Sequence, residues 1–323
     1  MALDEKIQEA KAVLQLGADM SAYYYHEPLI ICYSGGKDSD VMLDIAKRCL
    51  KPSEFEVMNS HTTVDAPETV YHIREVFAEC EKQGIKTRIS YPTYKGKRIT
   101  MWQLIPIKGI PPTRVMRYCC DVLKEQNTPN RLIAVGVRED ESSKRQGRDA
   151  FASIGSRATG NEWRSLQHTY AMFKIDKLGK EDTYECKFIQ SCKAKKDTLS
   201  NPIYKFTERD IWDYVKQYEV PMNPLYSKGY KRVGCVGCPL GGRKHQLKEF
   251  EDYPKYKAMY IRAFDRMLEE RKRKGLPILK YEFESGEEVF RWWLGYDPNQ
   301  VRIEDILKEG ENPHDNKRIA ENG

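Results

Sequence analysis

Four short runs of apolar residues recur along the first part of the chain, and polar segments separate them. The runs lie at 29–33, 55–58, 87–90 and 132–137. Short apolar runs of this length are typical of strands buried in a parallel sheet, and helical patterns fill the first two gaps between them. The pattern therefore predicts an α/β protein with an open, mostly parallel twisted sheet flanked by helices.

The first two gaps carry the signals of amphipathic helices. In the first gap, 40–50, Val41 and Ile45 fall on one face, four residues apart. The second gap, 66–84, ends at Gly84, and glycine commonly terminates a helix. Both segments are expected to pack against the sheet.

The second half of the chain is expected to be largely helical. Thr207 and Asp210 form a capping-box pattern, a basic helix is expected over 254–274, and Ser285 is expected to begin another. The predicted organisation is an α/β domain at 1–240 with a basic insertion of loops and a hairpin at about 142–200. A helical C-terminal region at 241–308 and a flexible tail at 309–323 follow.

Composition indicates a soluble protein with a full core. The chain has 323 residues, 40% of them hydrophobic, and no apolar run approaches the roughly 18 residues of a membrane helix. The first residues do not resemble a signal peptide, so no membrane partner and a cytoplasmic location are expected. The net charge is +6, and the segment 142–200 holds twelve Lys or Arg against seven Asp or Glu. That segment could face phosphates, including those of a nucleic acid, or be an ordinary solvated loop.

The stretch "ICYSGGKDSD" at 31–40 follows an apolar run and precedes a predicted helix. In a strand–glycine–helix arrangement, backbone N–H groups and the helix N-terminus converge on an anion. Gly35 and Gly36 permit a tight turn, while Lys37 and the hydroxyls of Ser34 and Ser39 add donors. The spacing excludes a Walker A loop, which has four residues between its glycines.

Residue for residue, this stretch resembles the SGGxDS loop of the ATP-pyrophosphatase (PP-loop) superfamily. Four further segments, which extend the match to 29–240, resemble the phosphoadenylyl-sulfate (PAPS) reductase family of that superfamily. They are "NSHTTVDAPETVYHIREV", "RYCCDVLKE", "VGVREDESSKR" and the stretch from "NPIYKF" to "GCVGCPL". His61, Thr62 and Thr63 replace the family's Asp-Thr-Gly. The resemblance implies a Rossmann-like, adenine nucleotide alpha hydrolase-like fold and an adenine nucleotide as ligand.

The resemblance also assigns the site. Residues expected to bind the nucleotide or its phosphates are Ser34, Gly35, Gly36, Lys37, Asp38, Ser39, Asn59, Arg138, Glu141 and Ser142. Catalytic roles are expected for Lys37, Asp38, Arg138 and Arg145. The two arginines flank the end of a predicted strand, where α/β sheets bind ligands, although a solvated basic turn is an alternative. Asp38 is expected to orient Mg²⁺ if ATP is the substrate, or simply to cap its helix.

Nine cysteines without an export signal favour metal binding or thiol chemistry over disulfides. Two pairs, Cys119–Cys120 and Cys235-x-x-Cys238, offer four thiolates, which suit zinc or an iron–sulfur cluster. The pattern resembles the [4Fe-4S] signature of adenylyl-sulfate (APS) reductases, with Cys192 or Cys186 as an alternative ligand. Three other cysteines are expected to be core residues: Cys32, Cys49 and Cys80.

Three functions remain open at this point. Sulfonucleotide reductases use a cysteine in an E-C-G-I/L-H motif near the C-terminus, whereas the last cysteine here is Cys238. A reductase acting on APS or PAPS would therefore need a thiol supplied elsewhere. The chain also resembles DNA-phosphorothioation sulfurtransferases and related phage or mobile-element proteins, which implies ATP-dependent sulfur transfer to a phosphate or nucleic-acid acceptor with a sulfur-donor protein as partner. The third function is a non-catalytic nucleotide-binding module.

Overall fold

The computed structural model describes residues 1–124, 131–141, 150–153, 198–276 and 283–296. They fall into two compact units. The first contains the described residues of 1–101 and 117–238, and the second contains 102–116 and the described residues from 239 onward. No helix in the described ranges combines the length and apolar character needed to cross a membrane.

The first unit is built on a six-stranded sheet with the order β3-β2-β1-β6-β8-β7. Five strands are parallel, and β7 at the edge is antiparallel to β8. The strands are β1 (Leu29–Cys32), β2 (Phe55–Ser60), β3 (Lys86–Ser90), β6 (Ile133–Ala134), β7 (Phe151–Ser153) and β8 (Thr198–Ser200). The predicted α/β architecture with a mostly parallel sheet is confirmed.

Alternate residues of the central strands point to opposite faces of the sheet, as the pleat requires. In β1, Leu29 and Ile31 join the main hydrophobic cluster, whereas Ile30 belongs to a smaller cluster with Met58 and Ile133. The strands are thus buried on both faces, which explains why they read as continuous apolar runs in the sequence.

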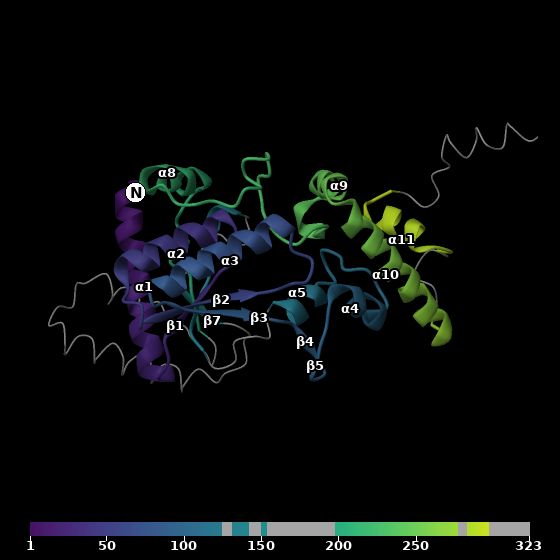
Figure 1. The fold of residues 1–323 in the computed structure, drawn as a ribbon, viewed down its shortest axis with the longest axis horizontal. Helices are drawn as coiled ribbons and strands as arrows, with labels where there is room; N and C mark the ends of the chain where they lie inside the picture. Colours follow the sequence, from purple (N-terminus) through teal and green to yellow (C-terminus); the bar gives the residue numbers. More distant parts are fainter. Residues whose placement is uncertain (125–130, 142–149, 154–197, 277–282, 297–323) are drawn as a thin grey trace, which may run out of the picture. The chain divides into compact units, whose positions relative to one another are not determined.

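Helices pack against the main face of this sheet. Following β1 and β2, α2 (Lys37–Cys49) and α3 (Pro67–Lys82) lie side by side, and α1 (Leu3–Tyr25) packs against α2, β1, β6 and β8 (Figure 1). On α1, Ala10, Val13 and Leu14 are fully buried, in the three- and four-residue spacing of an amphipathic helix. The core therefore lies between these helices and the sheet.

Short elements complete the first unit. The hairpin of β4 (Thr93–Tyr94) and β5 (Lys97–Arg98) follows β3, and α5 (Tyr118–Leu123) packs against β4. A 3₁₀ turn, η1 (Glu139–Glu141), follows β6, and α8 (Glu208–Tyr218) follows β8. At the start of α8, Thr207 accepts a hydrogen bond from the Asp210 amide, so the predicted capping box is confirmed.

The second unit is helical around an aromatic core. Its elements are α4 (Met101–Lys108), of which all but the first residue belongs here, η3 (Pro239–Gly241), α9 (Arg243–Asp252), α10 (Pro254–Arg273) and α11 (Gly286–Trp293). Tyr260, Phe264 and Trp293 form mutual ring contacts at its centre. A Cβ at Gly286 would lie 2.3 Å from the Ile261 carbonyl oxygen, so α11 begins where only glycine fits against α10.

One expectation about the middle of the chain needs correction. The strand predicted at 132–137 ends at Ala134, because Gly136 turns against the backbone of Asp38, where a Cβ would lie 3.2 Å from its carbonyl. The segment 142–200, expected as an insertion of loops and a hairpin, supplies the antiparallel neighbours β7 and β8 of the main sheet in its described parts. The predicted domain boundaries, including the tail at 309–323, stay predictions.

Candidate nucleotide site

The loop between β1 and α2 is a tight turn built on glycine. Gly35 has a φ of 71°, in the left-handed region, and a Cβ added to it would lie 2.9 Å from the Ile73 side chain. A residue other than glycine would therefore be strained by both backbone and contact. The turn leads directly into α2, which begins at Lys37.

The Ser39 hydroxyl fixes the shape of the turn. It donates to the Gly36 carbonyl (2.7 Å) and accepts from the Gly36 amide (3.2 Å). It also lies 3.2 Å from the Ser34 hydroxyl. At the end of β2, the buried Asn59 side chain donates to the Tyr33 carbonyl (2.9 Å) and ties the neighbouring strand to the loop. Ser39 and Asn59 thus hold the backbone in place.

Two residues from the segment after α8 hold the loop from outside. The Asn223 side-chain amide donates to the Gly35 carbonyl (2.8 Å), and the Tyr226 hydroxyl accepts from the Lys37 amide (2.8 Å). Both belong to the "NPLYSKGY" stretch, which sequence reasoning matched to the family pattern without giving either residue a role. Residues far from the loop in the sequence therefore help to keep this turn rigid.

Two buried cations lie at the start of α2. The Lys37 side chain is 7% exposed, and the Arg138 side chain, reaching in after β6, is 3% exposed. Arg138 Nε donates to Asp38 Oδ1 (2.6 Å), and Lys37 Nζ lies 3.3 Å from Asp38 Oδ2. The positive end of the dipole of α2 adds to the positive electrostatic potential of these two cations. Burial of charges is costly, so each cation needs an anionic partner.

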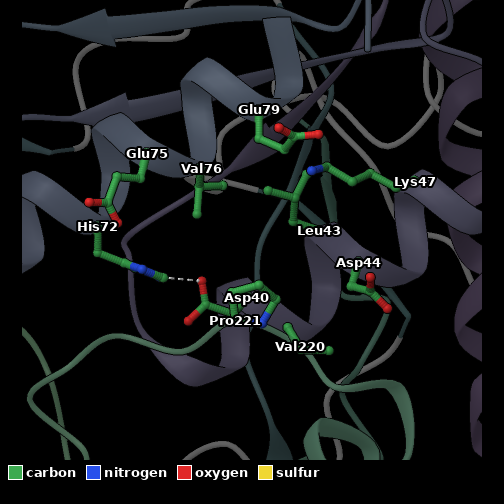
Figure 2. A pocket seen from close by; sticks show the side chains of 10 residues that line it. All are labelled: Asp40, Leu43, Asp44, Lys47, His72, Glu75, Val76, Glu79, Val220 and Pro221. Atoms are coloured by element: carbon green, nitrogen blue, oxygen red, sulfur yellow. Dashed lines mark hydrogen bonds and ion pairs between the residues drawn. The ribbon is translucent and has the colours of Figure 1, made fainter. Parts of the chain in front are cut away.

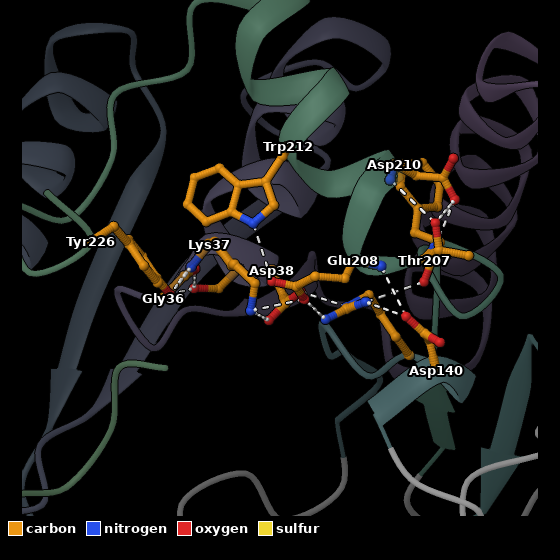
Figure 3. Close-up of polar contacts among 12 residues, drawn as sticks. Gly36, Lys37, Asp38, Asp140, Thr207, Glu208, Asp210, Trp212 and Tyr226 are labelled. Carbon is orange, nitrogen blue, oxygen red and sulfur yellow. Dashed lines mark hydrogen bonds and ion pairs between the residues drawn. The ribbon is translucent and has the colours of Figure 1, made fainter. Parts of the chain in front are cut away.

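Glu208, at the first position of α8, bridges both cations. Its Oε2 accepts from Arg138 Nη2 (2.7 Å) and lies 3.4 Å from Lys37 Nζ, although the Glu208 side chain is 50% exposed. Its Oε1 accepts from Trp212 Nε1 (3.1 Å). Figure 3 shows Lys37, Asp38 and Glu208 converging, with Trp212 beside them. Glu208 is thus the solvent-facing anion of a site whose cations are buried, a role that no sequence signal revealed.

Behind the loop, α2 and α3 are joined by a buried polar cluster. Asp40 Oδ1 lies 3.0 Å from His72 Nε2 and also accepts from the Tyr33 hydroxyl, while Asp40 Oδ2 has no hydrogen-bond partner among the described residues. A cavity of about 230 Å³ adjoins this cluster, with Leu43 and Val76 in its wall (Figure 2). Burial raises the pKa of the Asp40 carboxyl, despite the opposing effect of His72.

The raised pKa of Asp40 makes stability depend on pH. The native state holds the Asp40 proton more tightly than the unfolded state, so the free energy of unfolding falls as the pH rises through the raised pKa. Asp40→Asn removes this dependence. We expect the stability of the variant relative to the parent to rise with pH, measured by urea unfolding at several pH values from acid to neutral. Asp213→Asn, exposed on α8, is the control; an Asp40→Asn effect independent of pH would contradict the account.

All four cysteines of the two predicted pairs belong to the first unit. Cys119 and Cys120 lie on α5, and Cys235 and Cys238 flank a turn in which the Cys238 amide donates to the Cys235 carbonyl (3.1 Å). Gly237 permits the turn, with a φ of 76°. A hydrogen bond to the Cys120 thiol and burial raise the pKa of Cys119, and the charges of Cys235 and Cys238 raise it further, so the two pairs lie within electrostatic range of each other.

The local environments of these thiols differ. A hydrogen bond from the Cys119 thiol and the Arg117 guanidinium lower the pKa of Cys120. Burial raises the pKa of Cys235 to about 11, and its thiol donates to the Thr62 hydroxyl (3.4 Å). Thr62 belongs to the stretch that departs from the family pattern. Within the described ranges, no three Cys, His, Asp or Glu side chains are arranged around a common ion position.

The remaining described cysteines are core residues, as predicted. Cys80 is buried in the main cluster, and Cys32 and Cys49 pack against the two clusters. Burial raises the pKa of Cys32 to about 12 and that of Cys49 to about 11. These thiols are therefore protonated at neutral pH and poor nucleophiles.

The sequence can now be placed among known proteins. A family model, the phosphoadenosine phosphosulfate reductase domain, matches residues 28–240. The chain belongs to this family. The match spans the strand–loop–helix site, both arginine-bearing and cysteine-bearing segments, and the stretch that braces the loop. The family assignment made from the motifs is confirmed.

Relatives of this reductase-domain chain include two uncharacterized proteins of Methanocaldococcus jannaschii. One is 25% identical over 71% of the chain and 40% of the relative, and the other is 25% identical over 86% and 55%. The chain thus spans about half the length of these relatives. Among solved structures, the PAPS reductase of Candida auris in a phosphate complex matches with a TM-score of 0.40 and 15% identity over 73% of this chain and 96% of that one.

The structure brings most of the predicted reductase-family site residues together. Residues 34–39, Asn59 and Arg138 lie around one loop. Glu141 lies in η1, while Ser142, Arg145, Cys186 and Cys192 fall outside the described residues. Sequence reasoning missed Glu208, Asn223 and Tyr226, which reach the loop from at least 170 residues away along the chain.

Proposed function

We propose that this chain is a PP-loop enzyme that binds ATP by its polyphosphate and uses it for sulfur transfer to a phosphate or nucleic-acid acceptor. The observation that carries the proposal is the pair of buried cations, Lys37 and Arg138, at the N-terminus of α2. Their bridging partner is the half-exposed Glu208, which an incoming phosphate can replace. Charge-assisted bonds from buried cations hold phosphate oxygens strongly.

In the proposed reaction, an acceptor oxygen attacks the α-phosphorus of ATP and the bond between the α- and β-phosphates breaks. Negative charge develops on the departing pyrophosphate in this step. Lys37 and Arg138 stabilise that charge. Mg²⁺ enters with ATP as part of the substrate, and Asp38 is the residue proposed to orient it. A sulfur nucleophile then displaces AMP from the adenylated acceptor.

The four paired cysteines are proposed to hold a [4Fe-4S] cluster. Two soft thiol pairs, from α5 and the 235–238 turn, fit such a cluster by their chemistry. When bound, the cluster would supply iron that binds the transferred sulfur. The three core cysteines pack in or against the hydrophobic clusters, so within the described residues only the paired cysteines are proposed as ligands.

Product analysis with the full chain, purified anaerobically, tests this proposal. With ATP, a sulfur donor and an acceptor nucleic acid, we expect AMP and pyrophosphate. With APS or PAPS and a thiol reductant, release of sulfite would instead show a sulfonucleotide reductase. Tight ATP binding with no product in either assay would leave a non-catalytic nucleotide-binding module.

The Glu208 bridge yields a prediction of increased affinity. Glu208→Gln removes the internal anion that competes with phosphate for Lys37 and Arg138, yet keeps the length of the side chain. We expect ATP to bind roughly fivefold more tightly, equivalent to about 1 kcal/mol, by isothermal titration calorimetry. Asp213→Asn, on the same helix and paired with Arg209, should leave the affinity unchanged. Weaker binding by Glu208→Gln would show that the carboxylate contacts the bound substrate or its metal.

A further inference from the structure

The β4–β5 hairpin is a basic surface outside the nucleotide site. Residues 86–100 contain five Lys or Arg and no Asp or Glu. Lys95, Lys97 and Arg98, at and beside the turn, are all exposed. In the part of the chain that the structure describes, no carboxylate forms an ion pair with any of the three. Uncompensated cations on a protruding turn indicate a polyanionic partner.

Flat side chains are interleaved with these cations. The Tyr91 ring is 41% exposed and stacks on His61, with centroids 5.4 Å apart and planes 27° apart. The Arg98 guanidinium lies 4.4 Å from the centre of the Tyr91 ring, and Lys95 Nζ lies 5.7 Å from that of Tyr94. We call His61, Tyr91, Tyr94, Lys95, Lys97 and Arg98 the hairpin surface.

The mixture of planar rings and cations on the hairpin surface indicates which kind of polyanion it binds. Planar rings and guanidinium groups stack on bases that are not already stacked, while the lysines contact the phosphates between them. A duplex hides its base faces and a lipid surface has none, so neither uses the planar groups. We propose that the hairpin surface binds single-stranded nucleic acid.

The hairpin surface is connected to the cysteine pairs. The His61 amide donates to the Ser90 carbonyl (2.9 Å), and the next residue, Thr62, accepts from the Cys235 thiol (3.4 Å). α5, which carries Cys119 and Cys120, packs against β4 (Figure 1). A nucleic-acid strand bound to the hairpin surface would therefore pass beside the proposed cluster-binding cysteines. Its role as the acceptor rests on the proposed function, but its binding does not.

Fluorescence anisotropy with labelled single-stranded RNA and DNA of mixed sequence, without ATP, tests the proposal on the full chain. The triple variant K95A/K97A/R98A should bind at least tenfold more weakly. For this variant, the slope of log affinity against log salt concentration should be shallower by about 2, at roughly 0.7 per lost phosphate contact. The control K51A/K82A/K216A removes three exposed lysines elsewhere in the same unit and should bind like the parent.

Tyr91→Leu tests the stacking contribution separately. It should weaken binding about tenfold while leaving the salt dependence unchanged, because a ring is lost and no charge. Equal losses in the triple variant and its lysine control, no loss in either, stronger binding to duplex, or preferential binding to phosphatidylserine vesicles would each overturn the proposal. ATP affinity, measured on the same variants, should be unaltered. A parent that binds RNA but not ATP would refute the proposed function and leave this surface standing.

Discussion

Lys37→Met is expected to weaken ATP binding by at least tenfold, the largest effect of any single change in the loop. Lys37 is buried beside Asp38 and Glu208, and its loss leaves both carboxylates facing the incoming phosphates with only Arg138 opposite them. One charge-assisted hydrogen bond contributes about 1.5–3 kcal/mol, which corresponds to roughly 10- to 150-fold in affinity. Methionine keeps the apolar stem, so the core beneath the loop stays packed.

Calorimetry with ATP and thermal unfolding of the same samples separate a binding effect from a folding effect. Lys228→Met is the matched control, because Lys228 is an exposed lysine of the same unit that pairs with Glu68 (2.6 Å). Its affinity for ATP should equal that of the parent. A folded Lys37→Met that binds ATP with unchanged affinity would contradict the phosphate role.

Cys235→Ser is expected to abolish formation of the iron–sulfur cluster. Cys235 is the member of its pair that hydrogen-bonds Thr62 and pairs by a single β-bridge with Asp65, so the structure fixes its position more firmly than that of Cys238. Serine keeps the size but replaces a soft thiolate with a hard hydroxyl that iron in such clusters binds poorly. The parent, purified anaerobically, should be brown with matching iron and sulfide contents, and the variant colourless.

Cys49→Ser serves as the control, because Cys49 packs against the core far from both pairs in the sequence and should leave the cluster intact. Visible absorption, together with iron, sulfide and zinc analysis, provides the measurement. A colourless parent that contains zinc instead of iron, or a Cys235→Ser variant that keeps its cluster, would refute the ligand assignment.

The elements of the fold could be predicted from the sequence where strands are buried on both faces and where helices bury one face. β1 and β2 read as apolar runs because both of their faces pack in hydrophobic clusters, and α2 and α3 show the periodicity of one buried face. The apolar run is longer than the two-residue strand β6, since the Val137 amide turns back to the Val135 carbonyl (2.9 Å) and Gly136 lies against the backbone of Asp38. β7 and β8 are three residues long, too short for an alternation to be recognised.

The site residues could be predicted only where they lie close together in the sequence or follow a recognisable strand. The SGGKDS stretch carries its own geometry, and Arg138 follows a recognisable strand. Glu208 carries no such signal, because an acidic residue in the first turn of a helix is common for reasons of the helix dipole alone. Its contact with Lys37 and Arg138 depends on how α8 folds back onto the loop, which is a tertiary fact. The same holds for the hydrogen bond from Asn223 to the Gly35 carbonyl.

The central claim is that the polyphosphate of ATP takes the place of the Glu208 carboxylate between Lys37 and Arg138. A crystal structure with α,β-methylene-ATP, in which the bond to be broken is replaced, tests this most directly. The account predicts β- or γ-phosphate oxygens at about 2.7–2.9 Å from Lys37 Nζ and the Arg138 guanidinium, with Glu208 turned away toward solvent. An analogue bound elsewhere, with Glu208 still bridging the two cations, would contradict it.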